Sequence, residues 1–201
     1  MSYLVEAKNE FTIQLVNTLT PLIYEGLNSI YREAKKISKS NEILKMFQSF
    51  LKKIPSWNSS MIDDEKNRIL NNVDYPEDIL DLVRATIKSN ISILTFDTRS
   101  RKKINKSFYQ NVDLGDFFHR IYIECAREIW NNPYLFYHVY EPIDLKRNQR
   151  DTFTLIKTSI REAIRKMLPR RFILETYLNE DLDDKTDTNF EKSVTKQEGK
   201  V

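Results

Sequence analysis

Apolar residues recur at separations of three and four along most of this chain, the spacing that places them on one face of an α-helix. The apolar stripe is continuous over residues 2–38 and clearest over residues 146–168, so each range predicts one long helix. The same spacing predicts shorter helices over residues 41–53, 59–71, 76–95, 113–130 and 170–177. The pattern therefore predicts an all-α protein with about six to eight helices.

Residues that begin or end helices stand at the expected borders. Ser40 is a candidate N-cap of the second helix, and Asp113, with an acid three residues later, resembles a capping box. Pro169 ends the long helix before it, because proline cannot continue a helix. Pro21 lies inside the first helix, where it removes a backbone donor and clashes with the preceding turn. We therefore expect a kink or a break near residues 18–20.

Two segments lack the helical pattern. Residues 96–111 lose the apolar period and carry a run of basic side chains, which predicts a long exposed loop. Residues 179–201 have little apolar surface to bury and so cannot offset the entropy of ordering. The sequence thus predicts a single bundle-like helical domain over residues 1–178, followed by a tail over residues 179–201 that is disordered when alone.

The chain carries few of the residues that catalytic and cofactor sites need. It has three glycines, and neither a glycine-rich phosphate loop, nor a dinucleotide fingerprint, nor a His-Glu-x-x-His zinc motif occurs in it. His119 and His138 are its only imidazoles. Asp116 and His119 share a helix face, but we interpret Asp116 as a helix cap and His119 as a packed or solvent-facing residue. We predict a protein that is not an enzyme and has no cofactor and no metal.

The sequence also lacks the usual membrane and secretion signals. No apolar run approaches the ~20 residues that cross a bilayer, so we do not expect a transmembrane protein. The first ten residues carry acids and lack the basic start and apolar stretch of a signal peptide, which predicts synthesis in the cytoplasm. Cys125, the single cysteine, lies among apolar residues and is expected to be a small buried hydrophobe.

The net charge of +3 hides an uneven distribution of charge. Residues 179–201 hold seven acids and four lysines and carry −3, so the rest of the chain carries +6. The predicted loop contributes five basic residues: Arg99, Arg101, Lys102, Lys103 and Lys106. A nucleic-acid contact, a nuclear-import patch and a merely solvated loop are all compatible with this run.

A second basic surface is predicted near the end of the helical region. Its residues are Lys157, Arg161, Arg165, Lys166, Arg170 and Arg171. The first three are each four residues apart and therefore share one helix face. Such a face is suited to phosphates, to the acidic tail or to an acidic partner protein, and charge alone does not separate these interpretations.

An aromatic block lies between residues 130 and 140. Its candidate interface residues are Trp130, Tyr134, Phe136, Tyr137 and Tyr140. Aromatic side chains can stack on nucleic-acid bases, but they also dominate protein cores and interfaces. We interpret the block as core or protein interface.

Several stretches carry a resemblance to a known family. Three motifs stand out: Asn-Pro-Tyr-Leu-Phe at Asn132–Phe136, Arg-Lys-Met-Leu-Pro at Arg165–Pro169 and Ile-Leu-Glu-Thr-Tyr-Leu at Ile173–Leu178. The stretches that match are residues 11–34, 41–56, 116–136 and 160–178. Together they resemble an uncharacterised helical family of the nucleocytoplasmic large DNA viruses, those of algae and amoebae.

The resemblance implies a late, virion-associated protein, a minor component of an icosahedral capsid that bridges major capsid proteins from inside. It carries over no catalytic residue. Its implied partners are the major capsid protein or other minor capsid proteins, with a homo-oligomer as a further option. We therefore expect a structural interaction protein of a virus particle. The main alternative is a basic helical protein that binds nucleic acid or packages the genome, and an enzyme with an unfamiliar site ranks third.

Overall fold

The computed structural model describes residues 2–96 and 104–178, and these form helices joined by short connections. The elements are α1 (Ser2–Ile37), α2 (Ile43–Leu51), η1 (Ile54–Ser56), α3 (Ser59–Leu70), α4 (Pro76–Leu94), α5 (Ser107–Gln110), α6 (Leu114–Asn131), η2 (Pro133–Phe136), α7 (Pro142–Met167) and α8 (Arg170–Leu178). The described residues contain no strand, and the predicted all-α class is confirmed. The predicted disordered tail lies outside the described residues.

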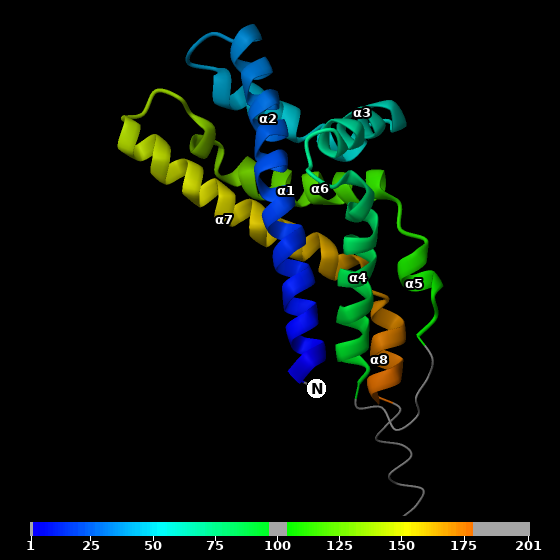
Figure 1. The fold of residues 1–201 in the computed structure, drawn as a ribbon. Coiled ribbons are helices and arrows are strands. Elements are labelled where there is room, and N and C mark those ends of the chain that lie inside the picture. Colours follow the sequence, from blue (N-terminus) through cyan, green and yellow to red (C-terminus); the bar gives the residue numbers. More distant parts are fainter. Residues whose placement is uncertain (1, 97–103, 179–201) are drawn as a thin grey trace, which may run out of the picture.

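Helix α1 runs through the whole molecule, and the other helices pack around it (Figure 1). The first half of α1 lies antiparallel to α4, and its second half packs against α2. Helix α7 crosses α1 near its middle and packs along α6, while α3 lies on the other side of α6. Helix α8 lies beside the last turns of α4. The first turn of α1 and the last turns of α4 and α8 therefore lie at the same side of the molecule.

One core joins these helices. The buried stripe of α1 contributes Leu15, Leu19, Ile23, Leu27, Tyr31 and Ala34. It meets buried aliphatic and aromatic side chains of α2, α4, α6 and α7, among them Phe47, Val83, Ile87, Ile121, Ile156 and Ile160. Each large apolar side chain buried in this way stabilises the fold by about 1.5–3 kcal/mol. No helix of the described part of the chain is long and apolar enough to cross a membrane.

Pro21 does not break α1. The helix is continuous from Ser2 to Ile37, so the expectation of a break was wrong. Pro21 is exposed, whereas Leu19, Leu22 and Ile23 on either side of it are buried. Packing on both sides of the proline holds the helix together, because a single proline removes one backbone hydrogen bond and leaves the tertiary contacts in place.

Three other local expectations need correction. Ser40 does not cap α2, because Glu42 precedes that helix and makes no side-chain cap. Helix α7 begins at Pro142, several residues before the expected start, since proline suits the first turn of a helix. Within the predicted loop, residues 107–110 form α5, whose Phe108 ring lies 5.0 Å from the ring of Phe172. This part of the loop is therefore packed rather than solvated.

A polar cluster connects α1, α3 and α6. The fully buried Tyr122 of α6 donates a hydrogen bond to Glu65 of α3 at 2.5 Å. Arg68 binds the same carboxylate with two nitrogens and also donates to the carbonyl oxygen of Leu22 in α1 at 2.7 Å. Burial raises the pKa of Tyr122 well above its usual value, and Glu65 raises it further, so the phenol stays protonated and keeps donating.

The tip of Tyr122 occupies the space beside Gly26. A β-carbon at position 26 would lie 1.9 Å from the Tyr122 hydroxyl oxygen, far inside van der Waals contact. We therefore expect Gly26→Ala to lower the free energy of unfolding by about 1–3 kcal/mol, the usual cost of overpacking. Urea unfolding followed by circular dichroism measures the change.

Two variants test the cause of that loss. Tyr122→Phe removes the atom nearest to the added methyl group, so Gly26→Ala should cost less in this background than in the parent protein. Ser29→Ala, on an exposed position of the same helix, should change stability little. An equal cost of Gly26→Ala in both backgrounds would show that the Tyr122 contact is not the cause.

Candidate functional site

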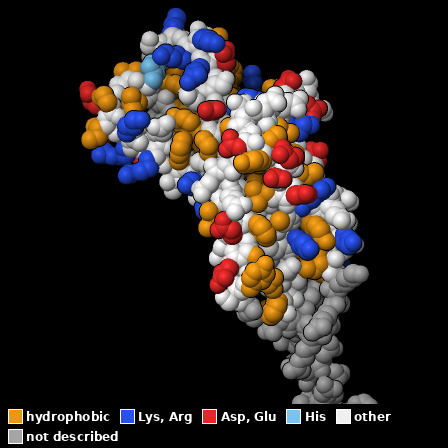
Figure 2. Space-filling view, viewed as in Figure 1, with side chains coloured by type: hydrophobic (Ala, Val, Ile, Leu, Met, Phe, Trp, Pro, Cys, Tyr) orange, Lys and Arg blue, Asp and Glu red, His pale blue; other side chains and the backbone are white. Residues whose placement is uncertain are grey.

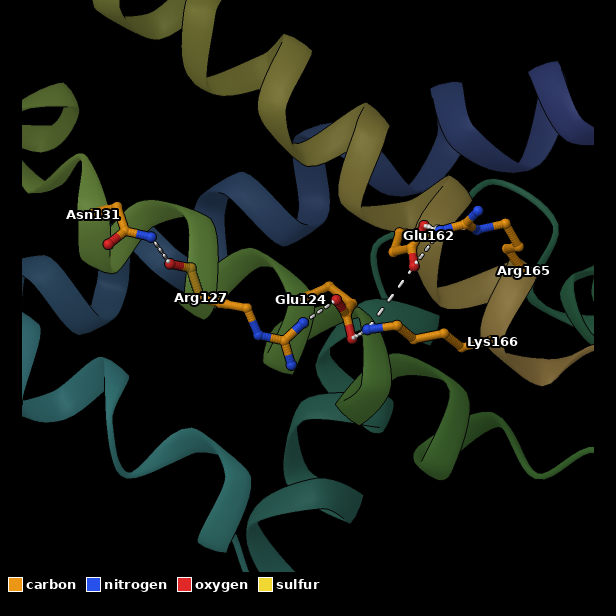
Figure 3. A network of polar contacts seen from close by, with 6 residues as sticks. All are labelled: Glu124, Arg127, Asn131, Glu162, Arg165 and Lys166. Atoms are coloured by element: carbon orange, nitrogen blue, oxygen red, sulfur yellow. Dashed lines mark hydrogen bonds and ion pairs between the residues drawn. The ribbon is translucent and has the colours of Figure 1, made fainter.

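A network of charged side chains fills the contact between α6 and α7 (Figure 3). Glu124 of α6 is buried, and its two carboxylate oxygens accept hydrogen bonds from Arg127 at 2.6 Å and from Lys166 of α7 at 2.7 Å. Lys166 also lies 3.9 Å from Glu162, which binds Arg165 through two hydrogen bonds of 2.9 Å. The network thus ties α6 to α7 and neutralises a buried carboxylate.

A polar groove of about 520 Å³ lies over this network. Its walls come from α6 and α7: Glu124, Arg127, Glu128, Asp151, Thr154, Leu155, Thr158, Ser159, Glu162 and Lys166. Beneath it, Cys125 is buried beside Ser159, and burial raises the pKa of its thiol to about 12. The thiol is therefore protonated and shielded, as predicted for a core cysteine, and does not supply a nucleophile at neutral pH.

The histidines and acids singled out in the sequence have structural roles. Asp113 caps α6 by accepting from the backbone N–H of Asp116, so Asp116 itself is not the cap. The His119 ring bonds through Nε2 to the carbonyl oxygen of Ile54 at 2.7 Å and stacks on Trp57. Within residues 2–96 and 104–178, no group of three or more His, Cys, Asp or Glu side chains is placed to hold a metal ion.

The exposed face of α7 carries a row of cations, here called the α7 basic stripe. It consists of Lys146, Arg150, Lys157, Arg161 and Arg165. At 100° per residue these positions lie within roughly 100° around the helix axis, and they extend for about 28 Å along it. Arg165 pairs with Glu162 and Arg150 lies 3.8 Å from Asp151, whereas the described residues offer no carboxylate to Lys146, Lys157 or Arg161. The stripe thus keeps part of its charge available.

The structure brings together only some of the predicted basic residues. Lys157, Arg161 and Arg165 share one face as expected, but Lys166 is bound to Glu124, and Arg171 pairs with Glu175 on α8. Arg99, Arg101, Lys102 and Lys103 lie outside the described residues, and Lys106 is exposed just before α5. The sequence interpretation did not include Lys146 and Arg150 in the basic surface, although both lie within the helix predicted over residues 146–168. The i, i+4 spacing of these two was the available signal.

The aromatic block does not form a single surface. Phe136 is buried and packs its ring against Tyr24, Tyr31 and Phe47, so of the two interpretations, core or interface, this residue belongs to the core. Trp130 is partly exposed, with the Lys52 ammonium 5.3 Å above its ring. Tyr134 and Tyr140 are exposed, and Tyr137 lies edge-on to Tyr140. The block therefore divides into a core residue and a rim of partly exposed rings.

Exposed apolar side chains gather instead where α1, α4 and α8 end together, a surface here called the three-helix end. Its residues are Tyr3, Val5, Phe96, Tyr177 and Leu178. Tyr3 is 78% exposed and Tyr177 66% exposed, values unusual for large rings. Figure 2 shows apolar side chains where α1 begins and α4 ends. Exposed apolar clusters of this kind mark interaction surfaces.

Comparison with known protein families shows which family the chain belongs to. The model of a family of unknown function, DUF5764, matches residues 1–137, which is more than half of the chain. The matched span covers α1 to η2 and ends before α7. No curated protein and no solved structure matches the chain.

The link between Glu124 and Lys166 should be measurable in a double-mutant cycle. We expect Glu124→Gln and Lys166→Met each to lower the free energy of unfolding, with a coupling between them of about 1 kcal/mol. The coupling is favourable because the carboxylate is buried, and it is modest because Lys166 is partly exposed to water. Urea unfolding of the parent, both single variants and the double variant gives the coupling.

The matched control is the exposed pair Arg171 and Glu175 on α8, which takes no part in the network. Its coupling in the same type of cycle should be smaller, because solvent screens this pair more strongly. A coupling for Glu124 and Lys166 no larger than that of the control pair would show that the network does not hold α6 and α7 together.

Proposed function

We propose that this chain, which belongs to the family of unknown function DUF5764, is a non-enzymatic protein that works by binding other proteins. The observation that carries the proposal is the three-helix end, where large apolar side chains of three helices remain exposed on one side of the molecule. Burying such side chains against a partner provides the main driving force of protein association.

The first turns of α1 support a binding role. No residue from Ser2 to Gln14 is fully buried, although this stretch forms nearly four turns of helix. An isolated helix of about 12–15 residues is marginally stable in water, so the stretch relies on its one-sided contact with α4. A partner that covers Tyr3 and Val5 would stabilise it further.

The charged groups support the same conclusion. The carboxylates of Glu124 and Glu162 form short ion pairs with neighbouring arginine and lysine side chains. The thiol of Cys125 is buried. An active site would instead need titratable groups that converge on a pocket and remain available to a substrate. The arrangement is that of a scaffold whose surface is used for contact.

The sequence resembles an uncharacterised helical family of large DNA viruses, and this resemblance supports the major capsid protein as the binding partner. We propose that the protein is a minor capsid component of such a virus, resides in the virion and bridges major capsid proteins. The helical body, without a strand in the part of the chain that the structure describes, suits a bridging element between larger shell proteins.

Purified, nuclease-treated particles provide the test. Quantitative mass spectrometry should find this protein in a fixed ratio to the major capsid protein, and empty shells should retain it. In particles grown with a Tyr3→Glu, Tyr177→Glu variant, the copy number should fall at least about tenfold, the change that a loss of 1.4 kcal/mol in binding produces. Adding charge to an apolar contact removes much of its burial energy.

The matched control is Val139→Glu, Ile143→Glu, which adds the same two negative charges to exposed apolar residues on the opposite arm of the molecule. This variant should enter particles normally. Absence of the parent protein from particles would refute the virion role, and equal incorporation of all variants would refute the three-helix end as the contact.

The α7 basic stripe supports a second candidate, binding of nucleic acid. Its cations follow one face of a long helix, and Lys146, Lys157 and Arg161 are not paired with carboxylates in the described residues. Cations in such a row bind phosphates by releasing the counterions that surround the nucleic acid. Loss of the protein from particles together with the genome would favour this candidate.

If the stripe binds nucleic acid, affinity for duplex DNA should fall steeply with salt. Replacing Lys146, Arg150 and Arg161 by Gln should then reduce the slope of log affinity against log salt by about 2–3, close to 0.9 per lost phosphate contact. Fluorescence anisotropy over a range of salt concentrations measures the slope. The control replaces Lys35, Lys39 and Lys45 by Gln; these exposed lysines lie in the last turn of α1, between α1 and α2, and in α2. If both variants show the same slope, the α7 basic stripe is not the surface that binds nucleic acid.

A further inference from the structure

A second groove lies where α4, α7 and α8 meet. It has a volume of about 670 Å³, and its floor is apolar, formed by Leu94, Leu168, Ile173 and Leu174. Leu94 is 47% exposed and Leu174 46% exposed, so the floor is not covered by any described residue. An open apolar groove of this kind favours an occupant with at least one apolar side chain.

The rim of this groove is basic. Arg165, Lys166 and Arg170 line it, and Glu162 is the one acid among the lining residues. Arg165 and Lys166 are partly compensated by Glu162 and Glu124, whereas Arg170 has no carboxylate partner among the described residues. The groove therefore presents apolar surface between positive charges, and it is complementary to an acidic segment that carries an apolar residue.

A segment with this chemistry follows directly in the sequence. Residues 180–184 read Glu-Asp-Leu-Asp-Asp, which places Leu182 between two pairs of acids. Residue 180 comes two positions after the last residue of α8, and α8 itself is about 13 Å long. Because an extended chain spans up to about 3.5 Å per residue, residues 180–184 can reach back along α8 to the groove.

We propose that residues 180–184 bind this groove within the same chain, with Leu182 on the apolar floor and the acids against Arg165, Lys166 and Arg170. Covalent attachment gives the segment an effective concentration in the millimolar range, so even weak contacts suffice for occupancy. A phosphate group would match the rim but would leave Leu94 and Leu174 exposed. The proposal does not depend on the three-helix end or on the proposed virion role.

Hydrogen exchange of the full chain provides the first test. Reversing Glu180, Asp181, Asp183 and Asp184 to Lys should speed amide exchange in α8 by about threefold or more, as expected if the bound state is populated about two thirds of the time. Lysines after the C-terminus of a helix stabilise that helix, so the direct effect of the substitutions on α8 opposes the expected change. The control reverses Asp187, Glu191 and Glu198 and should leave the exchange unchanged. Equal exchange in all chains would overturn the proposal.

A disulfide test locates the segment and identifies its source. Under mild oxidation, the variant Leu94→Cys, Leu182→Cys should form a disulfide within one chain, more readily than the same cysteine pair in a chain with Glu180, Asp181, Asp183 and Asp184 reversed to Lys, which has the same tether length. Cys125 does not interfere because it is buried. Equal disulfide formation in the two chains, or a disulfide that joins two chains, would overturn the proposal, and the second outcome would identify another copy as the occupant. Failure here would leave the particle test unaffected, because that test uses Tyr3 and Tyr177.

Discussion

The contact between Tyr122 and Gly26 is the constraint on which the arrangement of the helices depends. Tyr122 reaches from α6 to a point on α1 that only glycine leaves open, and its hydroxyl is held there by Glu65 and Arg68 of α3. Three helices are thereby fixed relative to one another by a few polar atoms inside an apolar core. Because α6 is rigid, its orientation at Tyr122 also determines where Glu124 lies, two residues further along. Glu124 then meets Lys166 of α7, so the position of α7 follows from the same contact.

This dependence explains which parts of the structure could be predicted from the sequence. The apolar period gave the helices because it is a local property, and it placed Gly26 within the buried stripe of α1. The reason for a glycine there is a tyrosine nearly a hundred residues later, and a single sequence does not show such a pairing. The same limit applies to Phe136, because the sequence left core and interface open for the aromatic block, and only the fold shows Tyr24, Tyr31 and Phe47 of α1 and α2 around this ring. At Pro21 the local signal predicted a kink or a break, but tertiary packing keeps α1 continuous from Ser2 to Ile37.

The predicted basic surface shows a different limit, because charge counts do not reveal ion pairs. Of the six basic residues grouped near the end of the helical region, Arg165, Lys166 and Arg171 are bound to carboxylates on α6, α7 and α8. Of the remaining three, Lys157 and Arg161 lie on the α7 basic stripe, whereas Arg170 borders the groove between α4, α7 and α8. One cluster in the sequence is thus divided between two surfaces of different chemistry. The first carries a row of cations of which only some are paired with acids, and the second combines cations with exposed leucines.

Because the α7 basic stripe and the groove between α4, α7 and α8 lie close together, binding at one affects binding at the other. The α7 basic stripe and the groove both include Arg165, so an occupant of the groove that is acidic lowers the positive potential at one end of the stripe. An acidic segment bound in the groove would therefore weaken binding of phosphates to α7 while leaving the three-helix end free. The effect is reciprocal, because a polyanion bound to the α7 basic stripe would weaken binding of an acidic segment in the groove by the same interaction energy. Occupancy of the groove and phosphate contact on α7 are then coupled through Arg165, although they use different faces of the fold.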